Sequence, residues 1–104
     1  MYLDICCYHI QQAIEKLLKL SIELQGMRYP YTHAIMPLYD MYIETGWDEL
    51  ELLELMAGTI TDWETSGRYK ESFSATIKQL DKAVSIYQEL EERVVVFLRD
   101  CQER

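Results

Sequence analysis

Three polar residues near the N-terminus have a spacing suited to binding a phosphate or a nucleotide. His9, Gln12 and Lys16 follow one another at intervals of three and four residues, so on a helix they lie on one face. An imidazole beside an amide and an ammonium group offers a phosphate both hydrogen-bond donors and positive charge. The alternative is a polar stripe that faces solvent or a second copy of the chain. The spacing therefore predicts a candidate site for a nucleotide or a partner.

Two further positions carry residues that bind phosphates in other proteins. His33 follows Thr32 at an expected helix start, where its ring and the free backbone N–H groups could orient a phosphate. Arg68 and Tyr69 follow Gly67 in an expected loop, where the guanidinium could clamp a phosphate and the ring could stack on a base. The alternatives are a capping or packing role for His33, and a surface arginine beside a packing tyrosine.

Metal and covalent chemistry are not indicated. The central acidic residues lack the carboxylate and histidine spacing of a metal site, and we interpret them as a solvated face. The sequence has no glycine-rich phosphate loop, no nucleophile elbow and no readable cysteine–histidine pair, so no cofactor is expected. These acidic residues are Asp48, Glu49, Glu51, Glu54, Asp62 and Glu64.

The charge of the chain restricts its partners. Its 104 residues include 18 acidic and 10 basic side chains, for a formal net charge of -8. Because a phosphate backbone is bound by clustered lysines and arginines, this balance argues against general nucleic-acid binding. A local basic pocket formed by Lys16, Lys19 and Arg28 remains compatible with it, and a basic protein partner is equally so.

The length and the cysteines indicate one domain, residues 1–104, in a reducing compartment. Cys6 and Cys7 are adjacent and make poor disulfide partners, and with Cys101 the count is odd. We expect all three to act as small core residues in a cytoplasmic protein. No basic, apolar leader and no run of about 18 apolar residues is present, so no membrane span is expected.

Apolar spacings of three and four residues predict four helices and an all-α fold. The first covers residues 3–24 and ends before Gly26; its polar positions, including Gln11, Glu15 and Lys19, should lie away from the core. The second covers about residues 33–44 with Thr32 as its cap, and the third covers residues 49–62 with Asp48 as its cap. The last begins after Ser72 or Ser74 and is long for the domain, so its end should pack on something outside the four-helix core.

The predicted inner faces of the later helices follow the same rule. On the third helix they include Leu52, Leu53, Leu55, Met56 and Ile60. On the last helix the residues spaced by three and four are Phe73, Ile77, Leu80, Val84, Tyr87, Val94, Leu98 and Cys101.

Three motifs resemble the HEPN family (higher eukaryotes and prokaryotes nucleotide-binding). The stretch Cys7-Tyr8-His9-Ile10-Gln11-Gln12-Ala13-Ile14-Glu15-Lys16 is similar to the family's signature helix, an aromatic-His-x-x-Gln-Ala-x-Glu-Lys pattern. Pro30-Tyr31-Thr32-His33 resembles the Thr-His pair that opens the next helix, and Arg68-Tyr69 resembles the Arg-Tyr pair before the last one. The motifs occur in the family's order and cover most of the chain.

This resemblance implies an antiparallel four-helix bundle that dimerises, often encoded beside a minimal nucleotidyltransferase in toxin–antitoxin or related pairs. Other members are RNases with an Arg, four to six residues, then His. Here no His follows Arg68 at that spacing, whereas Arg28 and His33 have the spacing in another place, which we interpret as coincidence. Members usually carry a helix before the signature helix, so the chain is expected to be a short form or a fragment.

Three hypotheses follow. The first is a HEPN-like module that binds a nucleotide or a partner, forms a homodimer or higher oligomer, and pairs with a nucleotidyltransferase without bond chemistry of its own. The second is a metal-independent RNase that uses Arg28 or Arg68 with His9 or His33, the histidine as base and the arginine for the developing charge. The third is a structural helical protein with no ligand.

Overall fold

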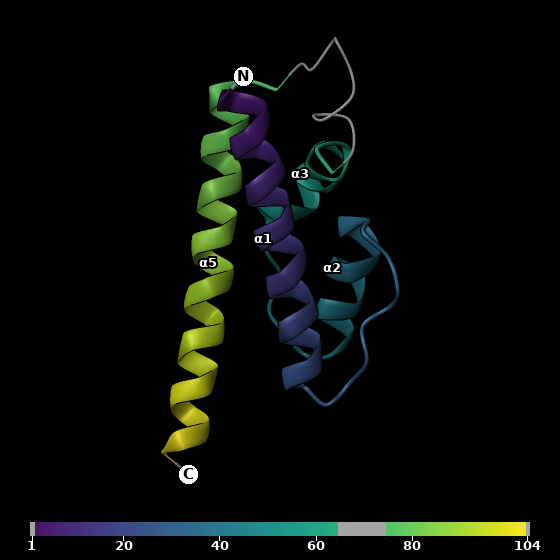
Figure 1. The fold of residues 1–104 in the computed structure, drawn as a ribbon. Coiled ribbons are helices and arrows are strands. Elements are labelled where there is room, and N and C mark those ends of the chain that lie inside the picture. The colour runs from purple at the N-terminus through teal and green to yellow at the C-terminus, as the bar shows by residue number, and fades with distance from the viewer. Residues whose placement is uncertain (1, 65–74, 104) are drawn as a thin grey trace.

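The computed structural model describes residues 2–64 and 75–103 and contains four helices in these ranges (Figure 1). They are α1 (Tyr2–Leu24), α2 (Ile35–Glu44), α3 (Glu51–Asp62) and α5 (Ile77–Gln102). No strand occurs in the described part of the chain. The all-α class and the long C-terminal helix predicted from the sequence are confirmed. None of the helices within these ranges has an apolar stretch long enough to cross a membrane.

The helices pack around one core, and their directions are set by the connections between them. α2 and α3 form an antiparallel pair: the Ile35 amide at the start of α2 donates to the Thr61 hydroxyl near the end of α3 (3.0 Å). α1 and α5 lie side by side and run in the same direction (Figure 1). α2 also runs in the direction of α1, because the ten-residue connection 25–34 returns along the bundle, and an extended chain of that length spans about 33 Å.

The fully buried side chains come from all four helices. Ile14, Leu18 and Ile22 of α1 meet residues of the other three helices in one cluster. Tyr42 is the largest of the fully buried side chains, and Trp63 closes the cluster after α3. The other buried members include Ile35, Leu38, Leu53, Ile60, Ile86 and Leu90.

The starts of α2 and α3 depart from the predicted caps. α2 follows Ala34 and α3 follows Leu50, and neither has a side-chain cap; the Thr32 hydroxyl instead accepts from the Ala34 amide within the preceding turn (3.0 Å). The predicted caps Thr32 and Asp48 are therefore wrong.

α5 begins after Thr76, which forms a capping box with Gln79, rather than after Ser72 or Ser74, which lie outside the described residues. Gly26 follows α1 with a φ of 83°, which confirms the predicted end of that helix.

The predicted inner face of α5 is rotated from the observed one. Ala83, Ile86, Leu90 and Val94 are its buried residues, whereas Ile77 is 68% exposed. A strict alternation of three and four residues has a period of 3.5, so it drifts around a straight helix of 3.6 residues per turn. Leu98, Cys101 and, on α3, Leu55 were also predicted to face the core and are exposed.

The cysteines divide between core and surface. Cys7 is fully buried, and burial, followed by its neighbour Cys6, raises the pKa of its thiol to about 11. Cys7 is thus a neutral core residue at physiological pH, as predicted. Cys6 and Cys101 are exposed, so the core role predicted for them is wrong.

Candidate functional site

A polar network occupies the middle of α1, inside the otherwise apolar contact with its neighbours. Glu15 is 5% exposed, and its carboxylate accepts hydrogen bonds from Gln11 Nε2 and Lys19 Nζ, each at 2.9 Å. His33 Nδ1 lies 3.1 Å from the same carboxylate. The fully buried Gln11 amide in turn accepts from Gln12 Nε2 at 2.8 Å. The network therefore joins α1 to His33, two residues before the start of α2.

The electrostatics of Glu15 follow from this set of donors. Burial alone would raise the pKa of a carboxyl group, but the hydrogen bonds from Lys19, His33 and Gln11 outweigh it and hold the pKa of Glu15 below its ordinary value. A buried carboxylate is tolerated only when it is paired and hydrogen-bonded. Glu15 is consequently an anion at neutral pH, and it offers a fixed acceptor to the loop.

The loop 25–34 is held against α1 at two places. His33 is bound to Glu15 near the loop's end, with 60% of its side chain exposed. Lys19 Nζ lies over the ring of Tyr29, 5.1 Å from its centroid, a cation–π contact. Between these anchors Tyr31 is fully exposed. The loop thus presents aromatic and basic groups to solvent from a defined position.

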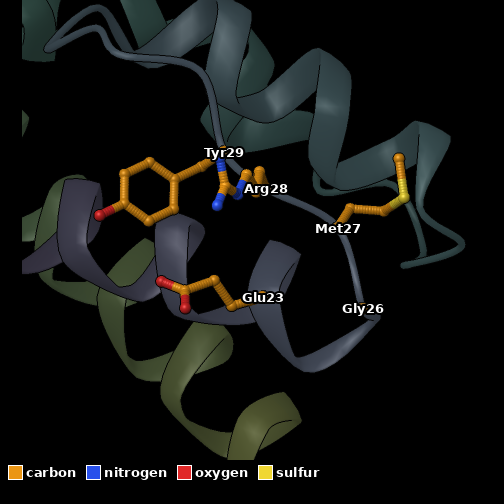
Figure 2. Close-up of a pocket in the computed structure, with 5 residues that line it drawn as sticks. All are labelled: Glu23, Gly26, Met27, Arg28 and Tyr29. Atoms are coloured by element: carbon orange, nitrogen blue, oxygen red, sulfur yellow. The ribbon is translucent and has the colours of Figure 1, made fainter.

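A pocket of about 470 Å³ opens at the C-terminal end of α1. It is lined by Glu23, Gly26, Met27, Arg28 and Tyr29. In Figure 2 the Arg28 side chain lies beside the Tyr29 ring, and the Glu23 carboxylate points toward them. A guanidinium next to an aromatic ring can contact a phosphate and a base or another planar group. The pocket is therefore a candidate binding site.

The residues predicted from the sequence are only partly brought together. His33 and Gln12 belong to the Glu15 network, whereas His9 and Lys16 are exposed on α1. His9 stands edge-on to the Tyr8 ring at 5.7 Å. Arg68 and Tyr69 lie outside the described residues.

The two candidate catalytic residues have different surroundings. Arg28 lines the pocket, whereas His33 lies against the Glu15 carboxylate. Among residues 2–64 and 75–103 no cluster of three or more His, Cys, Asp or Glu side chains could hold a metal.

Sequence reasoning missed Gln11 and Glu15, which were expected to lie away from the core and are buried. A signal was present: Gln11, Glu15 and Lys19 recur at intervals of four, so on a helix their side chains can bond in series. Glu15 and Lys19, one helical turn apart, form an ion pair at 2.9 Å.

Comparison with known proteins identifies the fold family. The model of the HEPN domain matches residues 1–98. No curated protein and no solved structure matches the chain. The match covers nearly the whole sequence, including the network of α1 and the loop that it anchors. The chain therefore belongs to the HEPN domain family.

Proposed function

We propose that this chain is a binding module that holds a nucleotide at the loop 25–34, dimerises and pairs with a minimal nucleotidyltransferase. The observation that carries the proposal is the loop itself. It is tied to α1 through Glu15 and Lys19, and it places Arg28 and Tyr29 in one pocket. Anchored in this way, the loop would lose little conformational freedom when a ligand binds.

The arrangement suits binding better than bond chemistry. Arg28 supplies donors for a phosphate, and Tyr29 supplies a ring for a base. His33, one of the two candidate bases of an RNase, is engaged with Glu15. His9, Gln12 and Lys16 are proposed as a second contact surface on α1, used with Arg68 and Tyr69 toward the nucleotide or the partner protein.

Titration with ATP tests the nucleotide site. Arg28→Gln should weaken binding by roughly tenfold to a hundredfold, because a hydrogen bond to a charged group is lost. Arg99→Gln, at an exposed arginine of α5, is the matched control and should bind like the wild type. Equal affinity of the two variants, or no binding of ATP, would contradict the nucleotide site.

An RNA cleavage assay separates this proposal from the RNase alternative. The purified chain should leave single-stranded RNA intact. Cleavage that survives metal chelation and is abolished by both Arg28→Ala and His33→Ala would reverse the ranking of the two functions.

Dimerisation is proposed from the apolar surface of the two longest helices. Exposed apolar side chains occur on α1 and on α5, which lie side by side (Figure 1). Such surface on a small domain is commonly covered by a partner subunit. These side chains are Tyr2, Ile5 and Leu20 on α1, and Ile77, Val95 and Leu98 on α5.

Sedimentation equilibrium at micromolar concentration should give the mass of a dimer or larger assembly. Leu20→Glu should dissociate it, whereas Leu55→Glu, at an exposed leucine of α3, should not. A monomeric wild type would refute dimerisation.

Pairing with the partner enzyme is tested separately. A nucleotidyltransferase encoded beside this chain should co-purify with it. Loss of co-purification in His9→Ala would support the second contact surface on α1. A wild-type chain that does not co-purify with it would contradict the pairing.

A further inference from the structure

A second groove, which shares no lining residue with the first pocket, lies between the turn before α3 and the C-terminal half of α5. Its volume is about 440 Å³. Trp47 and Phe97 contribute two rings, with centroids 5.3 Å apart and planes inclined at 47°. The lining residues are Trp47, Asp48, Glu89, Glu92, Arg93, Val96, Phe97 and Asp100.

The aromatic part of this groove is held rigidly. The Trp47 indole N–H donates to the backbone oxygen of Ser21 at 2.9 Å. Its ring also stacks on Tyr42, with centroids 5.4 Å apart and an angle of 6° between the planes. Because Tyr42 is fully buried, Trp47 is fixed to the core on one side while remaining partly exposed.

Arg93 is the one cation among the described residues that line the groove, and it is already engaged. Arg93 Nη1 donates to the Tyr42 hydroxyl (3.1 Å) and to the Asp48 backbone oxygen (2.7 Å). Its Nη2 donates to the Glu49 backbone oxygen (3.0 Å), and its Nε donates to the Glu89 carboxylate (2.9 Å). Arg93 therefore points toward the protein backbone. Of the four carboxylates that line the groove, it pairs only with that of Glu89.

The remaining carboxylates, Asp48, Glu92 and Asp100, have no ion pair within the described residues. Glu92, Val96 and Asp100 follow one another at intervals of four on α5, so the two acids flank an exposed valine on one face. Asp100 also lies in the last turn, where the helix dipole disfavours negative charge. These carboxylates do not stabilise the isolated chain, whereas a cation supplied by another molecule would pair with them.

We propose that this groove docks an arginine side chain of a protein partner. A guanidinium stacks on aromatic faces and pairs with carboxylates at its edges. The apolar stem of arginine can lie along Val96 and the two rings. A partner of different sequence fits better than a second copy, because a two-fold contact at this groove would place the acidic residues of one copy against the same acidic residues of the other. This docking site shares no lining residue with the proposed nucleotide pocket and does not depend on it.

The test uses a short helical alanine–leucine peptide with arginines at positions i and i+4, and its twin with citrulline at both positions. Citrulline keeps the shape of arginine and removes its charge. Binding is followed by the NMR signals of the two indole N–H groups, where the buried Trp63 serves as the internal reference for Trp47. The arginine peptide should shift the Trp47 signal and leave Trp63 unchanged.

Two double variants separate the groove from general charge attraction. Glu92→Gln/Asp100→Asn should lower affinity about tenfold or more. Asp62→Asn/Asp81→Asn removes the same charge from exposed positions elsewhere on α3 and α5 and should change affinity by less than about twofold. Since Glu92→Gln/Asp100→Asn removes repulsion at the surface, it should unfold no earlier than the wild type.

Equal binding of the citrulline peptide, equal affinity of the two double variants, or a Trp47 signal unmoved at millimolar arginine peptide would each overturn the proposal.

Discussion

Glu15 and Arg93 perform the same structural task with opposite chemistry. Each fastens a connection between helices to one of the two long helices, Glu15 on α1 and Arg93 on α5. Glu15 is buried, and its partners are all side chains, two of them from its own helix. Arg93 is half-buried and donates mainly to groups of the α2–α3 region, including two backbone oxygens.

The difference concerns dependence on ionisation. An arginine remains charged throughout the accessible pH range, and backbone oxygens do not titrate. A carboxyl group does titrate, so the anchor of the 25–34 loop depends on the ionisation of Glu15. Of the two connections, the one that carries the proposed nucleotide pocket is therefore the one that acid can release.

Removal of Glu15 should have the largest effect. Glu15→Ala deprives Lys19 and the buried Gln11 of their acceptor, and breaking a buried charged network costs about 3 kcal/mol. Urea denaturation measures this change in the free energy of unfolding. Glu23→Ala, at an exposed glutamate of the same helix, should stay within about 0.5 kcal/mol of the wild type. Equal destabilisation by both variants would show that Glu15 contributes no more to stability than an exposed glutamate of the same helix.

Removal of Arg93 should cost less. Arg93→Met keeps the apolar stem and abolishes the bonds to Tyr42, Asp48 and Glu49, for a loss of about 2 kcal/mol. Asp48 and Glu49 are exposed, so water can replace part of what their carbonyls lose. Thermal unfolding checks this against Arg99→Met, which should lose less than about 1 kcal/mol. A loss larger than that of Glu15→Ala would show that Arg93 contributes more to stability than Glu15.

The pH dependence of stability should distinguish the two anchors. The pKa of Glu15 is lowered in the folded state from its ordinary 4.5, so the unfolded chain takes up the proton first. The stabilisation is complete above that ordinary value and is lost as the pH falls through the folded pKa. Between about pH 6 and pH 3, Glu15→Gln should show a flatter profile of unfolding free energy than the wild type. Arg93→Met should keep the wild-type slope, and a flattened slope in that variant would count against the distinction.

The smallest expected effect on stability belongs to His33. Its side chain is mostly exposed and supplies one of three contacts to Glu15, so His33→Ala should cost less than about 1 kcal/mol. Hydrogen exchange of the amides in residues 25–34 should nevertheless accelerate, because the loop loses an anchor. His9→Ala is the control and should leave these amides unchanged. Unaltered exchange in His33→Ala would show that Lys19 and Tyr29 hold the loop without it.

Much of the fold followed from local patterns. Spacings of three and four predicted four helices, Gly26 marked the end of α1, and the family's motifs predicted the family that the HEPN match confirms. Pro37 lies in the first turn of α2, where a missing amide hydrogen costs nothing. The pairing of Glu15 with Lys19 was also predictable, since it depends on two residues one turn apart.

Local sequence was thus enough to place the helices, because helix formation depends on neighbours within a few residues. Which side of each helix is buried depends instead on how helices separated along the chain lie together, and local spacing does not contain this information. Gln11 and Glu15 are polar and yet buried because His33, 18 residues beyond Glu15, returns to their side of α1. Trp47 meets Phe97 across 50 residues of sequence to form the second groove. The spacing of residues within a single helix cannot predict such long-range contacts.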